Sequence, residues 1–154
     1  PAAMQGMAVV PLVAGYDLRR GSGRLFQYDV TGGRYEASNF AASGSGSLHA
    51  GTVVKLGFRE GLDRGDALDL AIRALFTAAD DDSATGGPDL VRGIYPTIAT
   101  ITGGGFEKLA DVEVAERFAG LLEALSAREA AIPGRLAETS TDTSSGPRGG
   151  EVTR

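Results

Sequence analysis

The clearest periodic signal in the chain is an apolar stripe that follows Asp63. Its members recur at i, i+3, i+4, i+7 and i+11, as the buried face of an α-helix does: Leu68, Ala71, Ile72, Leu75 and Ala79. Asp63 precedes them and suits the N-cap position. A helix with one apolar face must bury that face against another element, so the segments on either side of it decide the fold class.

Three strands are predicted before this helix. Residues 7–16 form an apolar, β-branched run typical of a buried strand, in which Pro11 must lie at an edge, at a bulge or at the strand start. Residues 25–30 and 34–40 are predicted to pair, because the glycines of 31–33 are typical of a tight hairpin turn. The three segments together predict a β-meander.

The remaining segments add two helices and another pair of strands. A helix is predicted at 48–59, with Leu48, Val53 and Leu56 on its apolar face. Further along the chain, strands are predicted at 94–102 and 106–109, and a third helix at 111–127. The order of strands, two helices, two strands and a helix indicates an α+β fold with a largely antiparallel sheet.

Length and pattern predict one domain and a tail. The periodic segments all lie within residues 1–127, a length that suits a single domain. The pattern disappears from Arg128 onward, and residues 139–154 are rich in Gly, Ser and Thr. We therefore predict a disordered polar tail over 128–154.

Composition limits the kinds of site that the chain can carry. It has 154 residues, no Cys, one His and a formal net charge of -5. Without Cys there are no disulfides, cysteine zinc sites, iron–sulfur clusters or thiol nucleophiles, and one His excludes a site built from several histidines. The acidic balance argues against a nucleic-acid partner. No apolar run approaches the ~20 residues of a membrane-spanning helix, so a cytoplasmic protein without a membrane partner is expected.

A glycine–serine turn, Gly44–Ser47, precedes the helix at 48–59. Free N–H groups at such a helix start can cradle an anion. The dinucleotide pattern fails, however, because His49 stands where its last Gly should be, and the phosphate-loop pattern fails as well. A helix N-cap with flexible glycines is the favoured interpretation, with the anion cradle as the alternative.

Three carboxylates, Asp80–Asp82, follow the second helix. A calcium loop starting at Asp80 fails because Thr85 replaces the required Gly and Val91 replaces the bidentate Glu. No metal or cofactor is therefore expected. Two interpretations stay open: a solvated acidic turn, or one Asp that orients a catalytic or binding group.

Three other polar residues, His49, Lys55 and Arg92, lie near these two loops in the sequence. His49 is interpreted as a packing or surface residue rather than as part of a Ser–His–Asp triad, because nothing marks Ser45 as lying on a nucleophile elbow. Lys55 and Arg92 are candidate counterions for the carboxylates, although structural ion pairs are the commoner use of such residues.

Several segments share their order and spacing with a known family. They are Met4–Gly6, Pro11–Asp17, the turn Ser43–Ser47, the loop Asp82–Gly87 and the stretch Ala78–Gly93. The turn looks like that family's Gly-Ser-Gly-Ser segment, and the loop looks like its Asp-x-x-Ser-Gly segment. In this order they resemble the second half of a proteasome β-subunit of the bacterial 20S, actinobacterial type, over about residues 1–127.

The resemblance implies a fold and an activity. The family has the N-terminal-nucleophile hydrolase fold, an α/β/β/α sandwich, which would be incomplete here because the first strands and helix are not found in the chain. It implies a threonine endopeptidase that works without a cofactor in a cytoplasmic barrel of stacked rings. The implied partners are proteasome α-subunits, other β-subunits, unfolded or tagged protein substrates, and a regulatory ATPase that acts through the α-ring.

The resemblance also implies roles for individual residues. Ser45 would hydrogen-bond near the amine of the nucleophilic Thr, and Asp82 would orient the same group and balance its charge. Thr85 would occupy the position usually held by Ser, and Gly46 would help to shape the site. Lys55 is in the wrong context to replace the family's catalytic Lys.

Lys108 is likewise in the wrong context to replace the family's catalytic Lys. The resemblance places the nucleophilic Thr and the catalytic Lys before Pro1. The chain alone is therefore expected to be inactive. It is also expected to fold unstably, because strand edges and apolar strands would be uncovered. A noncatalytic ring subunit, a degenerate product and an acidic metal-binding module are the alternatives.

Overall fold

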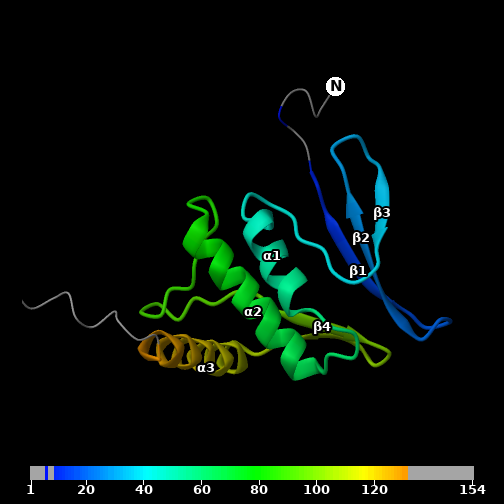
Figure 1. Ribbon diagram of the computed structural model, residues 1–154. Coiled ribbons are helices and arrows are strands. Elements are labelled where there is room, and N and C mark those ends of the chain that lie inside the picture. The colour runs from blue at the N-terminus through cyan, green and yellow to red at the C-terminus, as the bar shows by residue number, and fades with distance from the viewer. Residues whose placement is uncertain (1–5, 7–8, 132–154) are drawn as a thin grey trace, which may run out of the picture.

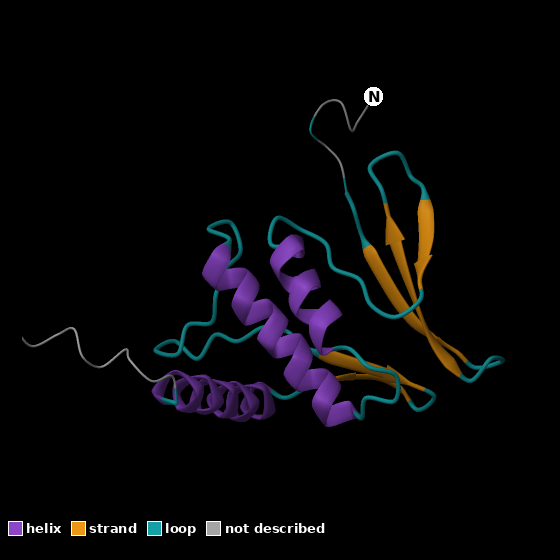
Figure 2. Cartoon of the chain, viewed as in Figure 1, coloured by secondary structure: helices purple, strands orange, loops and turns teal. Residues whose placement is uncertain are grey.

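A computed structural model describes Gly6 and residues 9–131. Its elements are β1 (Leu12–Asp17), β2 (Ser22–Tyr28), β3 (Arg34–Ala37), α1 (Ser47–Gly57), α2 (Arg64–Asp81), β4 (Ala99–Thr102), β5 (Gly105–Lys108) and α3 (Asp111–Ala130). Figure 1 shows α1 and α2 side by side, with the three-stranded sheet on one side and α3 on the other. The predicted order of elements and the α+β class are confirmed (Figure 2).

The first sheet is an antiparallel meander in the order β1-β2-β3, as predicted. Its hairpin turn forms around Asp29, whose carboxylate accepts hydrogen bonds from the backbone N–H of Thr31 at 2.9 Å and of Gly33 at 2.8 Å. Pro11 directly precedes β1, an edge strand, which confirms its predicted position at a strand start. β1 begins later than predicted, and the predicted residues 7 and 8 lie outside the described part.

The second sheet is the β4–β5 hairpin, and here one prediction is wrong. The predicted strand at 94–102 forms only from Ala99 onward. Asp89 accepts a hydrogen bond from the backbone N–H of Arg92, and this turn pairs Asp89 with Ile94 in an isolated bridge. Pro96 then lacks the N–H that a continuing strand would need.

The hydrophobic core lies between α2, α3 and the second hairpin. Its buried members are Leu68, Ile72, Ile98, Leu109, Val114 and Phe118. The Phe118 ring meets Phe76 of α2 edge-on, with centroids 5.5 Å apart. The predicted stripe of α2 is confirmed at Leu68 and Ile72, whereas Leu75 is 41% exposed.

Helix α1 differs most from the prediction. Leu48 and Leu56, placed on the buried face, are 75% and 83% exposed. The helix contacts α2 through small residues instead. A Cβ on Gly57 would lie 2.4 Å from Leu70 Cδ1, and a Cβ on Gly46, just before α1, would lie 3.0 Å from Ala78 Cβ. Val53 and Val54 are half-buried beside these glycines, whereas both leucines lie on the exposed side of the helix.

Two helix ends also lie beyond their predicted limits. Helix α2 continues through Asp81, so Asp80 and Asp81 are helical rather than part of the loop. Helix α3 continues through Ala130, which makes the first residues of the predicted 128–154 tail helical. Residues 132–154 of that tail lie outside the described part. Within the described residues, no helix is both long and apolar enough to span a membrane.

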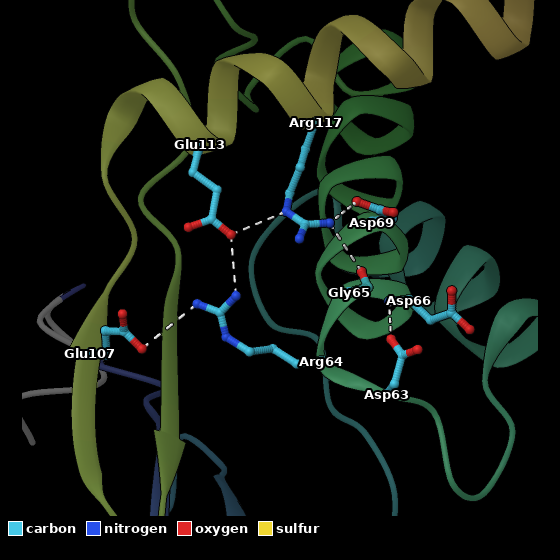
Figure 3. Close-up of polar contacts among 8 residues, drawn as sticks. All are labelled: Asp63, Arg64, Gly65, Asp66, Asp69, Glu107, Glu113 and Arg117. Carbon is cyan, nitrogen blue, oxygen red and sulfur yellow. Dashed lines mark hydrogen bonds and ion pairs between the residues drawn. The ribbon is translucent and has the colours of Figure 1, made fainter.

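An ion-pair network fixes the start of α2 against α3 and β5 (Figure 3). Arg64 contacts Glu113 at 3.2 Å and Glu107 at 3.7 Å. Arg117 donates to Asp69 at 2.7 Å and also contacts Glu113 at 3.4 Å. Nearby, Asp63 accepts from the backbone N–H of Asp66 at 2.8 Å, which confirms the predicted N-cap. This network lies at the start of α2. The turn Ser43–Ser47 and the loop Asp82–Gly87 meet at the opposite end of the same helix.

Candidate functional site

The glycine–serine turn changes direction sharply just before α1. Gly44 has a φ of 101°, a backbone conformation that favours glycine. Its carbonyl accepts a hydrogen bond from Ser47 N–H at 3.1 Å, and Gly46 is the N-cap residue without a side chain to cap the helix. The turn therefore presents Ser45 outward, and Gly46 is buried beneath it.

Three predicted site residues are brought together at one carboxylate oxygen. Ser45 Oγ donates to Asp82 Oδ2 at 2.5 Å, and Thr85 Oγ1 donates to the same oxygen at 2.5 Å. The other carboxylate oxygen accepts from Ala84 N–H at 3.3 Å. Hydroxyl-to-carboxylate hydrogen bonds of this length are charge-assisted and are among the stronger ones in proteins. We call Ser45, Asp82 and Thr85 the hydroxyl–carboxylate cluster.

The hydrogen bonds explain how a carboxylate is tolerated at this place. Asp82 is the C-cap of α2, where a negative charge is unfavourable to the helix dipole. The hydrogen bond from Ser45, followed by the one from Thr85, lowers the pKa of Asp82 below its ordinary value. Asp82 therefore stays ionised to a lower pH than an ordinary aspartate does. Of the two open interpretations, this geometry favours an Asp that orients a neighbouring group over a merely solvated turn.

Gly46 makes the close approach of the two loops possible. A Cβ at this position would lie 2.7 Å from Thr85 Oγ1, 3.0 Å from Ala78 Cβ and 3.4 Å from Asp82 Oδ2. Any side chain would therefore push α1 away from the end of α2. The predicted shaping role of Gly46 remains a prediction as far as activity is concerned, but its steric basis is clear.

The structure also bears on the other interpretations of the two loops, namely an anion cradle, a metal site and Arg92 as a counterion. The carboxylate of Asp82 already lies at the start of α1, where an anion cradle would hold its ligand. Within the described residues, no three Asp, Glu or His side chains are grouped to hold a metal ion. Arg92 pairs with Asp89 and not with the carboxylates of 80–82.

His49 was not expected at this site, yet it lies beside the cluster. Its Nδ1 is 3.3 Å from Asp81 Oδ2, and both side chains are partly exposed. When protonated, His49 makes the smallest of the contributions that lower the pKa of Asp82, after the hydrogen bonds of Ser45, Thr85 and the backbone N–H of Ala84. No short motif signals this contact, because it joins two helices that are separated in the sequence.

The chain is similar to known proteins over most of its length. The family model described as "Proteasome subunit" matches residues 2–91. A "Proteasome subunit beta" of Streptomyces griseus is 55% identical over 121 residues, which are 79% of this chain and 43% of that protein. One of Acidothermus cellulolyticus is 51% identical over 138 residues, 87% of this chain and 46% of that protein.

A third similar protein, also a "Proteasome subunit beta", is that of Acidimicrobium ferrooxidans. It is 47% identical over 130 residues, which are 84% of this chain and 48% of that protein. The chain thus spans less than half the length of the relatives it matches.

Proposed function

Since the chain belongs to the proteasome subunit family, we propose that it is part of the catalytic β-subunit of a bacterial 20S proteasome, a threonine-type endopeptidase. Family membership confirms the resemblance predicted from the two loops and implies the N-terminal-nucleophile hydrolase fold. The incomplete form of the α/β/β/α sandwich stays a prediction. The hydroxyl–carboxylate cluster is the part of the peptidase site that this chain would supply.

One observation carries the proposal. Ser45 and Asp82 are 37 residues apart in sequence, yet their side chains meet at 2.5 Å. The Thr85 hydroxyl joins the same oxygen. A ring subunit that serves only as a building block does not require two hydroxyls on one half-buried carboxylate.

The cluster suits the support of an amine. Ser45 Oγ donates its proton to Asp82, so its lone pairs remain directed elsewhere and can accept a hydrogen bond. An α-amine has an ordinary pKa of about 7.7–8.0, so it can act as a base near neutral pH. In the family's reaction this amine, or a water beside it, takes the proton of the Thr hydroxyl that attacks the peptide carbonyl. We propose that Ser45 positions that amine and that Asp82 stabilises its charged form.

Thr85 would take part through Asp82. Its hydroxyl fixes the rotamer of the carboxylate from the side opposite to the backbone N–H of Ala84, which binds the other oxygen. The family usually has Ser here, and Thr keeps the hydroxyl with one additional methyl group. The working partners under this proposal are α-subunits, further β-subunits and a regulatory ATPase at the α-ring, and the substrates are unfolded or tagged proteins of the cytoplasm.

The proposal is tested on the protein that naturally carries this chain, purified from its own cells. N-terminal sequencing is expected to give a mature subunit that begins with Thr, and the assembled particle is expected to hydrolyse a fluorogenic peptide. A covalent threonine-directed inhibitor should abolish the hydrolysis. Assembled rings without an N-terminal Thr and without hydrolysis would contradict the proposal and favour a noncatalytic ring subunit.

A further inference from the structure

An open groove runs between α2 and α3 toward the C-terminal ends of both helices. Two hollows, with cavity volumes of about 270 and 460 Å³, adjoin there and share Phe76, Asp80 and Leu122. Phe76 and Leu122 are half-buried and pack against the hydrophobic core, and Leu125 continues the apolar lining toward the end of α3. We call this surface the α2–α3 groove. It leaves apolar side chains next to the core partly open to water.

The charges at the mouth of the groove do not cancel. On the α3 side, Arg128 and Glu129 have opposite signs. On the α2 side, Asp80 lies at a helix end that carries two further carboxylates. None of the described residues pairs with the Asp80 carboxylate or donates a hydrogen bond to it. The groove therefore suits an apolar segment that also carries one positive charge.

The chain itself has such a segment directly after α3. Large aliphatic residues occur at three positions beyond Ala131, and two of them, Ile132 and Leu136, are among the first five. The only charged residue between these two is Arg135. The dipeptide Pro133–Gly134 is typical of a β-turn, and a turn at this point would direct the following residues back along α3.

The segment is long enough to reach the groove. Leu136 is the fifth residue after Ala131, and an extended chain of that length spans at most about 18 Å. Leu125 lies six residues before Ala131, which is about 9 Å at the rise of an α-helix. The chain can therefore turn back along the helix and bring Leu136 to Leu125.

We propose that residues 132–136 dock in the α2–α3 groove of their own chain. Ile132 and Leu136 cover its apolar lining, and Arg135 pairs with Asp80. Attachment to α3 keeps the segment near the groove at a high effective concentration, which favours it over a partner free in solution. Ordering of the five residues opposes the gain from burial, so the docking is reversible. The inference is independent of the peptidase activity, and it removes residues 132–136 from the predicted disordered tail.

Disulfide formation in the natural protein that carries this chain tests the docking. The test pair combines Ala137→Cys, directly after the segment, with Ser126→Cys, which lines the groove without contributing to its apolar surface. The control pair combines Ala137→Cys with Ala127→Cys. Ala127 lies about 200° around the helix from Leu125, away from the groove, and it is closer to the tail in sequence than Ser126.

The substituted positions on α3 are exposed, so neither change disturbs the core. This chain has no Cys of its own, and each single variant controls for disulfides with other parts of the protein. Under mild oxidation the test pair is expected to form its disulfide about tenfold faster than the control pair. A preference of this size corresponds to the burial of one leucine side chain.

Two further changes in the test pair separate the apolar contact from the ion pair. Leu136→Ser is expected to remove the preference for the groove, because it removes the buried side chain. Arg135→Glu is expected to reduce the preference about two- to threefold, as the loss of an exposed ion pair does. Arg148→Glu is the matched control, because it reverses a charge further along the tail, and it should leave the preference unchanged.

Equal rates in the test and control pairs, or a faster control pair, overturn the inference, because a freely moving tail meets Ala127 at least as readily as Ser126. A disulfide between two subunits also overturns it, and assigns the groove to the tail of a neighbouring copy. A preference that survives Leu136→Ser overturns the docking by apolar contact. A preference that is unchanged in Arg135→Glu overturns the ion pair with Asp80.

Discussion

Ser45 Oγ and Asp82 Oδ2 lie 2.5 Å apart and connect the turn before α1 to the residue that ends α2. The contact satisfies two requirements at once. It supplies a donor to a carboxylate at an unfavourable helix end, and it fixes a hydroxyl at an exposed edge of the molecule.

Asp82→Asn is expected to lower kcat/KM of the assembled peptidase by about 100-fold, a size typical of displaced catalytic groups. The amide has no negative charge, and its NH₂ group must face either the two hydroxyl donors, which share one oxygen, or the backbone N–H of Ala84, which binds the other. Steady-state hydrolysis of a fluorogenic peptide measures the effect. Asp80→Asn is the matched control, because it removes a charge from the same helix end without touching Ser45 or Thr85. Equal losses in the two variants would refute a special role for Asp82.

Thr85→Val is expected to raise the pKa of Asp82 toward its ordinary value, because one of the two hydroxyl donors is lost while the shape is kept. Thr85→Ser retains the hydroxyl and should leave the pKa of Asp82 low. Carboxyl ¹³C NMR of labelled aspartate across an acid titration measures both. If Val and Ser behave alike, the Thr85 hydroxyl does not contribute to the ionisation of Asp82.

Gly46→Ala is expected to destabilise the fold by about 1–3 kcal/mol, as overpacking of a close contact does. The new Cβ would meet Thr85 Oγ1 at 2.7 Å and Ala78 Cβ at 3.0 Å. Gly86→Ala is the control, because a Cβ at Gly86 meets nothing within 4 Å. Thermal unfolding followed by circular dichroism compares the two variants. A Tm for Gly46→Ala equal to that of Gly86→Ala would show that the loops tolerate a wider separation.

The sequence pattern predicted local structure correctly at positions where one or two residues determine the backbone conformation. Asp63 capped α2 and the glycines of 31–33 formed the hairpin turn, because both depend on short-range hydrogen bonds and backbone freedom. The convergence of Ser45 and Thr85 on Asp82 depends on how α1 packs on α2. Pattern alone left the role of Asp82 open, and the family resemblance was needed to bring the three together.

Two errors share a physical cause, namely that a local pattern does not reveal tertiary partners. Leu48 and Leu56 recur with helical spacing, but α1 packs on α2 through a different side, which includes Gly46 and Gly57, and both leucines are exposed. The β-branched residues after Ile94 have strand propensity, but the turn made by Asp89 and the ring of Pro96 delay the strand. The His49–Asp81 contact was missed because it spans two elements whose packing has no short motif.

Asp29 provides a prediction that involves no activity. Its carboxylate accepts hydrogen bonds first from the Thr31 hydroxyl and then from Gly33 N–H, and these lower the pKa of Asp29 to about 2. An aspartate with a lowered folded-state pKa stabilises the fold fully above its unfolded value of about 3.9, and the contribution is lost as the pH falls through the folded value.

Asp29 is therefore expected to stay ionised in the folded protein down to about pH 2, and its contribution to stability should be lost between about pH 4 and pH 2. Asp29→Asn should remove that part of the pH dependence, because the amide does not titrate. Chemical denaturation at a series of pH values measures the slope of stability in this window for both proteins. Asp66→Asn is the control, since its carboxylate pairs with Arg59 far from the hairpin. Identical slopes for wild type and Asp29→Asn would mean that the hairpin does not hold the Asp29 carboxylate ionised. The hydrogen bonds that Thr31, Gly33 and Tyr35 donate to it would then not lower its pKa as the geometry indicates.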